Sequence, residues 1–412
     1  MLSEKPAGAT VREAGPEDAV CGVTPRWVAL PETVEEIASV LRACAERGLA
    51  VVPAGGGTKL HWGPPPERLD VLLDLCCMNE IVEHAAGDLV VRAQAGVTMD
   101  ALASALAETG QELALDVPFT EGTTIGGTLA AAVAGPRAFR YGTARDLLIG
   151  ITVVLPDGTV ARSGGKVVKN VAGYDLGKLF TGSFGTLGVI AEATFRLHPL
   201  PADRRWIVAV VEPPRVSESG PCQARELAAM LAAAQEEPSA VELDWPHGQG
   251  PIWMTVLVEG AAAEDRARTL AARMGEVVTA VRDEPPPQWG LIVDDRLLAE
   301  VRFPPAALTE VLDAVHYTGF SLRGSAVAGR LWLELWGEEG RAGEEDEERV
   351  TGAVAALRDR LEGCGARLVV HATPYESVQR WGRVGALPLM RRVKERFDPG
   401  RVMSPGRFVG GI

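Results

Sequence analysis

The chain has 412 residues, of which 47% are hydrophobic and 23% are charged, and its formal net charge is −14. This length exceeds that of one ordinary hydrophobic core, and the composition is typical of a folded protein with at least two domains. The negative charge argues against nucleic acid as the main partner. No apolar run is long enough for a membrane span and no secretory signal opens the chain, so we expect a cytoplasmic protein, either free or held at the inner face of the membrane through partners.

The first elements along the chain are predicted as strand, helix and strand over residues 27–53. Apolar residues recur at helical spacing until Gly48, which stops the pattern, and residues 50–52 predict the next strand. That strand runs directly into Gly55-Gly56-Gly57. A nicotinamide-binding fold would start a helix at this loop. Because Pro64-Pro65-Pro66 follows instead, we expect no helix there and no nicotinamide site of that type.

Short strands joined by tight turns are predicted from residue 69 to residue 200. Pro156-Asp157-Gly158 is a hairpin signal, because Gly158 tolerates a positive φ. Only one helix, over residues 98–109, is predicted in this region, so we expect an α+β domain. The predicted strands cover residues 71–75, 89–91, 149–155, 159–162 and 187–197.

The composition changes after Pro199-Leu200-Pro201, where alternating strands and helices indicate a second, smaller sheet with helices on one face. The predicted strands are 206–211, 252–258 and 331–336, and the predicted helices are 223–235 and 262–273. We expect a solvated loop or helix start over the acidic residues 338–348 and a helix near 386–397. The expected division is an N-terminal arm (1–21), a first domain (22–200), a second domain (201–370) and a C-terminal segment (371–412) that packs on the first domain.

Two glycine-rich segments, residues 53–58 and 122–128, lie about seventy residues apart. Residues without a Cβ let the backbone approach a ligand closely, and successive N–H groups in such turns form a concavity that suits an anion. Each glycine alone is better explained by an ordinary turn. Two such segments together predict a diphosphate held from two sides, and therefore a large dinucleotide.

Further motifs fill the stretch from residue 116 to residue 196. They are Asp116-Val117-Pro118, Arg140-Tyr141-Gly142, Lys169-Asn170-Val171-Ala172-Gly173-Tyr174-Asp175 and Gly182-Ser183-Phe184-Gly185-Thr186-Leu187-Gly188-Val189-Ile190. With residues 53–58, this block resembles the FAD-binding domain of the vanillyl-alcohol oxidase/PCMH flavoprotein family, and within it the branch of D-lactate dehydrogenases and glycolate oxidase. The likeness covers about residues 20–200, and Asp398-Pro399 and Pro405-Gly406-Arg407 near the end support it.

The resemblance implies FAD as cofactor and an α+β fold. That fold has a PCMH-type FAD-binding domain of two α+β subdomains, a smaller α/β cap-like domain, and a C-terminal segment that returns to the FAD domain. Residues 54–58 match the first pyrophosphate loop, and Pro118 with residues 122–127 match the segment beneath the diphosphate and beside the isoalloxazine ring. The implied cofactor-binding residues are Pro53, Ala54, Gly55, Gly56, Gly57, Thr58, Lys59, Pro118, Gly122, Thr123, Thr124, Gly126, Gly127, Tyr141, Gly142, Gly185, Gly188, Val189 and Ile190.

The resemblance also implies how the flavin is held. Family members with histidyl-FAD carry a histidine in the first loop where this chain has Thr58, and His61 does not align with that linkage. We therefore expect non-covalent FAD. Lys59 either adds positive charge near the diphosphate or faces solvent.

The substrate side departs from the catalytic members of the branch. Those members carry a paired-histidine motif that suits a divalent cation, whereas His371 has no close histidine or acidic neighbour in register, so we expect no metal site and name no catalytic residue. Phe184 stands where the relatives have glutamate. With the shortened second domain, these departures resemble the FAD-binding component of bacterial glycolate oxidase that accompanies its catalytic-type flavoprotein. The implied partners are that catalytic-type flavoprotein subunit and an iron–sulfur subunit.

Other constellations leave alternatives open. Arg323 and Arg330 could clamp a carboxylate, or they form surface salt bridges. The six cysteines have no spacing typical of a metal or iron–sulfur site, so we expect the chain to hold no cluster of its own.

Three functions remain in competition. The first is an FAD subunit of a multi-subunit glycolate oxidase, the second a stand-alone FAD-dependent 2-hydroxyacid dehydrogenase, and the third a non-catalytic assembly subunit that retains the flavin fold.

Overall fold

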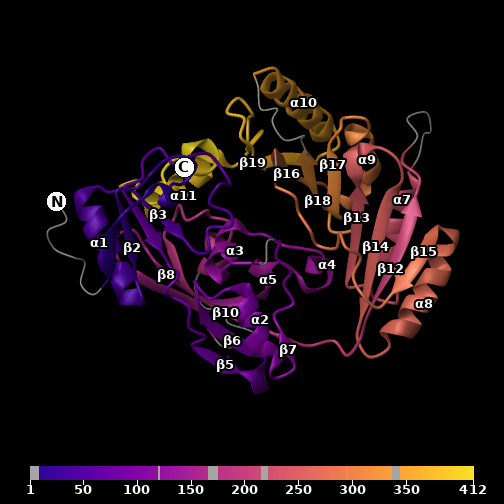
Figure 1. Cartoon of the computed structure of the whole chain (residues 1–412), viewed down its shortest axis with the longest axis horizontal. Helices are drawn as coiled ribbons and strands as arrows, with labels where there is room; N and C mark the ends of the chain where they lie inside the picture. The colour runs from indigo at the N-terminus through magenta and orange to yellow at the C-terminus, as the bar shows by residue number, and fades with distance from the viewer. Residues whose placement is uncertain (1–8, 119–120, 166–174, 215–220, 295, 336–343) are drawn as a thin grey trace. The chain divides into compact units, whose positions relative to one another are not determined.

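A computed structural model describes residues 9–118, 121–165, 175–214, 221–294, 296–335 and 344–412 (Figure 1). The chain forms two compact units. Unit 1 comprises residues 1–134, 142–200 and 384–412, and unit 2 comprises residues 135–141 and 201–383. Both units mix helices and sheets, which confirms the α+β class. No helix within the described ranges is long and apolar enough to cross a membrane.

Unit 1 contains a mixed four-stranded sheet in the order β1-β2-β4-β3 and an antiparallel five-stranded sheet in the order β5-β6-β10-β8-β9, and β11 pairs with β7 separately. The strands are β1 (Thr10–Glu13), β2 (Trp27–Leu30), β3 (Val51–Ala54), β4 (Val71–Asp74), β5 (Glu83–Ala85), β6 (Val90–Gln94), β7 (Gln111–Glu112), β8 (Leu148–Val154), β9 (Val160–Gly164), β10 (Val189–Arg196) and β11 (His198–Pro199). The helices are α1 (Val34–Arg47), α2 (Met99–Ala107), α3 (Ile125–Ala131), α5 (Ala144–Leu147), α6 (Leu176–Phe180) and α11 (Leu387–Phe397).

Local sequence signals account for helix α1 and for the absence of a helix after β3. The Thr33 hydroxyl accepts a hydrogen bond from the Glu36 N–H at the start of α1, and Gly48 ends it with φ +64°. Ile37 and Leu41 are fully buried on its inner face. No helix begins between β3 and β4, as Pro64-Pro65-Pro66 predicted.

Unit 2 is built on an antiparallel eight-stranded sheet in the order β15-β12-β14-β13-β17-β18-β16-β19. Its strands are β12 (Arg204–Val211), β13 (Ala240–Trp245), β14 (Ile252–Glu259), β15 (Val278–Arg282), β16 (Leu297–Arg302), β17 (Ser321–Ser325), β18 (Arg330–Leu335) and β19 (Arg367–Ala372). Its helices are α4 (Ala138–Tyr141), α7 (Gln223–Ala232), α8 (Ala263–Met274), α9 (Leu308–Val315) and α10 (Glu344–Gly363).

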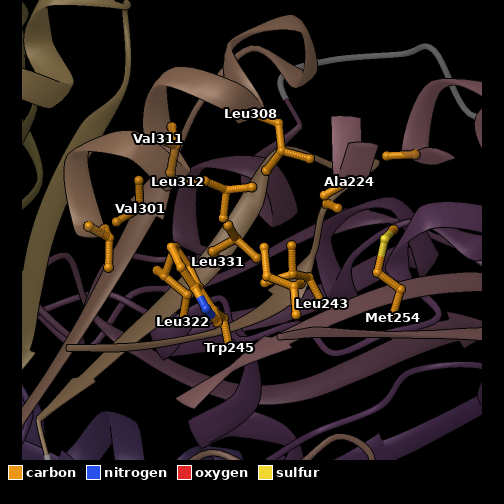
Figure 2. Close-up of a cluster of buried hydrophobic side chains, with 14 of the residues drawn as sticks. Ala224, Leu243, Trp245, Met254, Val301, Leu308, Val311, Leu312, Leu322 and Leu331 are labelled. Carbon is orange, nitrogen blue, oxygen red and sulfur yellow. The ribbon is translucent and has the colours of Figure 1, made fainter. Parts of the chain in front are cut away.

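The core of unit 2 lies on one face of this sheet, where α7, α8, α9 and α10 pack. Figure 2 shows Trp245, Leu322 and Leu331 of the sheet beside Leu308 and Leu312 of α9. Because side chains alternate along a strand, the residues between them point to the other face. That second face carries charged residues, among them Asp244, Glu300, Arg323, Arg330 and Glu334.

The C-terminal segment belongs to unit 1 from Val384 onward, and residues 371–383 and 135–141 lie in unit 2. After α11 the chain extends beside β3: the Val51 N–H donates to the Val402 carbonyl (2.8 Å) and the Ser404 N–H donates to the Val51 carbonyl (2.8 Å). Residues 384–412 of the expected segment therefore return to unit 1, whereas residues 371–383 do not. The sequence pattern missed β13, β15, β16, β17, β19 and helix α9, whereas α10 begins within the acidic residues 338–348, where a loop or a helix start was expected.

Candidate functional site

The first glycine loop leaves the carboxyl end of β3, a strand whose valines are buried. β3 pairs in parallel with β4 on one side, and residues 402–404 lie on its other side. Being held from both sides, β3 places residues 55–58 at a defined edge of the sheet, as is typical of ligand-binding loops in open sheets.

The second glycine segment packs directly against the first. A Cβ on Gly56 would lie 1.6 Å from the Gly122 carbonyl oxygen, and a Cβ on Gly55 would lie 2.2 Å from the Thr124 hydroxyl. A Cβ on Gly126 would lie 2.8 Å from the Cβ of Ala95. These distances show that only glycine fits where the two segments meet. Helix α3 starts here, with the Thr124 hydroxyl accepting from the Gly127 N–H (3.3 Å), a feature that the sequence pattern did not predict.

A third loop, residues 182–188, completes the arrangement. Gly185 has φ +69°, and a Cβ added to it would lie 2.7 Å from the Pro53 ring. Phe184 has φ +53°, a left-handed conformation that costs about 1–3 kcal/mol for a residue with a side chain. Its ring lies 5.7 Å from that of Phe408. The surrounding packing therefore imposes this conformation on Phe184.

The three loops and residue 407 enclose a pocket within unit 1, which we call the glycine pocket. It is lined by Val52, Pro53, Ala54, Gly55, Gly56, Gly57, Thr58, Lys59, Leu60, Leu75, Ala95, Thr124, Gly126, Gly127, Ala130, Ala131, Phe184, Gly185, Gly188, Ile190 and Arg407. Thirteen residues expected at the cofactor site are among them: Pro53, Ala54, Gly55, Gly56, Gly57, Thr58, Lys59, Thr124, Gly126, Gly127, Gly185, Gly188 and Ile190. Segments that are far apart in the sequence thus meet at one hollow.

Six expected residues do not line the glycine pocket. Gly122 and Thr123 lie directly behind the first loop, where the Thr123 hydroxyl is within 3.1 Å of the Thr58 hydroxyl. Pro118 is buried and Val189 packs in the core of unit 1. Gly142 lies against Asp146, while Tyr141 belongs to unit 2 and donates to the Glu259 carboxylate (3.3 Å). Residues 169–174 of the family-like block lie outside the described residues.

Two cationic side chains give the pocket its charge. The Lys59 ammonium donates to the hydroxyls of Thr58 (3.0 Å) and Thr123 (3.2 Å), and burial lowers the pKa of Lys59 to about 8. The Arg407 guanidinium is 4% exposed, and burial lowers its pKa as well. Desolvated cations beside glycine N–H groups favour an anionic ligand.

The lining therefore fits a dinucleotide with an aromatic ring system. Glycine loops and two cations suit a diphosphate, while Val52, Leu60 and Ile190 supply apolar surface for rings. Thr58 holds hydrogen bonds to its neighbours, and His61, an exposed residue, is not part of the lining.

Sequence reasoning missed several lining residues. Leu60, Leu75, Ala95, Ala130 and Ala131 carry no chemical signal, and only the tertiary fold brings them to the pocket. Arg407 stood in the terminal Pro-Gly-Arg motif, so its position after a turn was visible in the sequence but its role was not. Phe184 was noted for replacing a glutamate, and the structure adds that it lines the pocket.

The candidate residues of unit 2 are engaged in ion pairs. Arg323 bonds Asp244 (3.1 Å), and Arg330 pairs with Glu300, which also lies 3.5 Å from the His371 ring. The side chains of Arg323 and Arg330 are 11% and 16% exposed, so these are interior salt bridges rather than the surface ones we considered. No group of three or more His, Cys, Asp or Glu residues in the described ranges could hold a metal ion.

Comparison with known proteins identifies the first unit. A family model described as "FAD binding domain" matches residues 25–164. Glycolate oxidase subunit GlcD of Bacillus subtilis is 36% identical over 195 residues, which is 46% of this chain and 42% of that protein. D-2-hydroxyglutarate dehydrogenase of Bos taurus is 38% identical over 172 residues, 42% of this chain and 32% of that protein.

Two longer matches extend the comparison. D-lactate dehydrogenase of Archaeoglobus fulgidus is 32% identical over 259 residues, 61% of this chain and 58% of that protein. The aligned part thus spans about a third to three fifths of these three relatives. A solved alkyldihydroxyacetonephosphate synthase superposes with a TM-score of 0.67 at 16% identity, covering 93% of this chain and 77% of that one, which shows a shared fold. Residues 25–164 therefore form an FAD-binding domain, and the cofactor is FAD.

Proposed function

We propose that the protein is the FAD-binding subunit of a multi-subunit oxidase or dehydrogenase that converts glycolate, or a related 2-hydroxyacid, to the 2-oxoacid and passes electrons to an iron–sulfur partner. The observation that carries the proposal is the glycine pocket, where glycine loops from three segments converge with two cations. Relatives described as a glycolate oxidase subunit and as D-lactate and D-2-hydroxyglutarate dehydrogenases support the substrate class. Because the Bacillus subtilis relative is named as a subunit, we expect this protein to work with partners, among them a catalytic-type flavoprotein. We keep the cytoplasm as the expected location.

Each part of the glycine pocket has a proposed role in holding the cofactor. When bound, FAD supplies the two-electron acceptor that oxidation of an alcohol carbon requires. The N–H groups of residues 55–58 and the Lys59 ammonium would hold the diphosphate. Phe184 and Ile190 would cover the apolar part of the cofactor. Thr58 offers no nitrogen for a covalent link, so we propose that the flavin is held non-covalently.

The purified chain tests the cofactor assignment directly. We expect a yellow protein whose flavin is released into the supernatant by acid precipitation, because no covalent bond retains it. A colourless protein that takes up no FAD on reconstitution would contradict the proposal.

Pull-down of the tagged chain from its source tests the proposed partners. It should bring down an iron–sulfur protein, detected by its iron content and visible absorbance.

The stand-alone dehydrogenase is kept as the second candidate, because its relatives include proteins named as dehydrogenases without a subunit designation. It predicts that the isolated chain loses its visible flavin absorbance when given glycolate or D-lactate without oxygen, because the substrate reduces the flavin. No bleaching with a panel of 2-hydroxyacids, together with activity of the assembled complex, would decide for the subunit. If complex activity survives when this subunit alone has lost its flavin, the non-catalytic assembly role is correct.

A further inference from the structure

Arg407 is the most deeply buried cation of the glycine pocket, and it comes from the far end of the chain. Its Nη1 donates to the Pro64 carbonyl (3.0 Å) and to the Cys21 sulfur (3.1 Å), and its Nη2 donates to the Leu60 carbonyl (2.8 Å). These acceptors are neutral. Among the residues that the structure describes, no carboxylate lies within salt-bridge distance of Arg407.

This environment is unusual for an arginine that is 4% exposed. A buried guanidinium stays protonated, and removing it from water is costly unless an anion compensates its charge. Carbonyl dipoles compensate only part of that charge. Elsewhere in the chain a buried cation does have its anion: Lys394 lies 2.7 Å from the Asp398 carboxylate. The described residues therefore provide no counter-ion for Arg407, and an anionic ligand can provide one.

The donor geometry agrees with this conclusion. A guanidinium carries five N–H groups, and three of those of Arg407 are directed at the acceptors just named, two from Nη1 and one from Nη2. The second N–H of Nη2 and the N–H of Nε remain. Adjacent donors of this kind match two oxygens of one phosphate or carboxylate group.

The backbone around Arg407 is held in place before any ligand binds. The Lys394 ammonium donates to the carbonyls of Thr186 (2.7 Å) and Met403 (2.8 Å), which ties the C-terminal segment to the third loop of the pocket. Asp398 in turn accepts from the N–H groups of Val402 (2.9 Å) and Met403 (2.8 Å). Because Arg407 follows within a few residues, its guanidinium is positioned in advance rather than drawn in from solvent.

We propose that Arg407 is an anion-binding residue of the glycine pocket, which pairs with the diphosphate of the cofactor or with the carboxylate of the acid substrate. The proposal rests on the proposed function, because it assumes that FAD occupies this pocket. The carbonyls of Leu60 and Pro64, which accept hydrogen bonds from Arg407, lie just after the first glycine loop. This position favours the diphosphate as the bound anion.

The test compares Arg407→Gln, Arg407→Lys and the control Arg401→Gln in the full-length protein freed of flavin. Arg401 lies in the same segment, but its side chain is 51% exposed and pairs with Glu67, so the control removes the same charge from the surface. The dissociation constants of FAD and of ADP are measured by flavin fluorescence and by competition. Urea unfolding without ligand verifies that each variant is folded.

We expect Arg407→Gln to weaken both FAD and ADP by about tenfold or more, Arg407→Lys to weaken them less, and Arg401→Gln to leave them unchanged. If FAD and ADP binding are unchanged but the glycolate or D-lactate concentration for half-maximal flavin reduction rises about tenfold, the anion is the substrate carboxylate. The proposal would be overturned if folded Arg407→Gln showed both unchanged dissociation constants for FAD and ADP and an unchanged substrate concentration for half-maximal flavin reduction.

Two further outcomes are distinguishable. If Arg407→Gln does not fold, Arg407→Lys decides, because lysine keeps the charge but cannot offer the paired donors; affinities equal to those of the unmodified protein would then overturn the proposal. If the unmodified protein itself binds no FAD, the proposed function fails, and Arg407 loses its assumed ligand for that reason.

Discussion

Buried charge is handled in opposite ways on the unit 2 sheet and in the glycine pocket of unit 1. On the second face of the unit 2 sheet, arginines and carboxylates neutralise one another, as in Arg323 with Asp244 and Arg330 with Glu300. In the glycine pocket of unit 1, Arg407 is also buried, but within the described part of the chain it bonds to carbonyls and a thiol rather than to a carboxylate. A charge that is paired within the chain contributes to the structure of that unit. A charge that is left without a counter-ion indicates where an outside anion binds.

The glycines show a related contrast between the pocket and ordinary turns. At the pocket, Gly55, Gly56 and Gly126 sit where a Cβ would overlap another segment, so they allow the loops to meet. Gly250, Gly275 and Gly319 of unit 2 have positive φ and open space around the Cβ position, as ordinary turns require. The pocket glycines therefore permit close packing between segments, whereas these three permit a reversal of the chain.

The largest effect that would test this comparison is expected from Lys394→Met. The change leaves the Asp398 carboxylate buried without its cation and releases the third loop from the C-terminal segment. We expect the free energy of unfolding to fall by about 3–5 kcal/mol, together with weaker FAD binding, measured by urea unfolding and flavin fluorescence. As a control, Arg268→Ala breaks two surface ion pairs between exposed side chains, with Glu264 and Asp265, and should change stability by less than about 1 kcal/mol.

Arg330→Met sharpens the comparison from the side of unit 2. Glu300 would keep only Arg302 and His371 as partners, so we expect a loss of about 3 kcal/mol in unfolding free energy. The FAD dissociation constant of the folded variant should stay within about twofold, because the ion pair is a structural feature of the sheet. A variant of normal stability that binds FAD poorly would show that this arginine serves the cofactor after all.

Gly56→Ala should act through the contact between the two glycine segments. The added methyl would overlap the Gly122 carbonyl, which belongs to the backbone and must move, so we expect a stability loss of about 1–3 kcal/mol and little retained flavin. Gly57→Ala is the matched control: its Cβ meets only Leu60 at 4.0 Å, and its φ of +74° costs about 1 kcal/mol. Flavin content per chain and thermal unfolding distinguish the two. Equal flavin content would contradict the close contact.

The smallest effect is a pH dependence of FAD binding that Lys59 should produce. Burial lowers the pKa of Lys59 to about 8 in the free protein, and a bound diphosphate would raise it. Binding then takes up a proton above pH 8, so affinity should be constant below that pH and fall above it, by at most about tenfold per pH unit. Between about pH 8 and the ordinary lysine pKa, the folded state binds fewer protons at Lys59 than the unfolded state does. The contribution of Lys59 to the free energy of unfolding of the flavin-free protein should therefore rise with pH over that range.

Lys59→Met is the control for this titration. It removes the titrating group, so FAD affinity should become independent of pH over the same range. A pH dependence that persists in this variant would assign the titration to another group.

Much of unit 1 could be predicted from local sequence signals. Thr33 and Gly48 mark the ends of α1, Pro156-Asp157-Gly158 marks the turn between β8 and β9, and the glycine-rich segments mark the loops of the pocket. Unit 2 was harder. Its strand β16 is buried on both faces, with Glu300 directed away from the core, so its residues do not show the clean alternation that identifies a half-buried strand.

The sequence by itself determined that the chain contains glycine loops suited to a dinucleotide, because the freedom of a residue without a Cβ is a local property. The tertiary structure alone decided which loops meet. Gly56 touches Gly122, Lys394 reaches Thr186 across more than two hundred residues, and Arg407 arrives at the first loop from the other end of the chain. Such contacts depend on how distant segments pack, and no periodicity or motif within one segment encodes them.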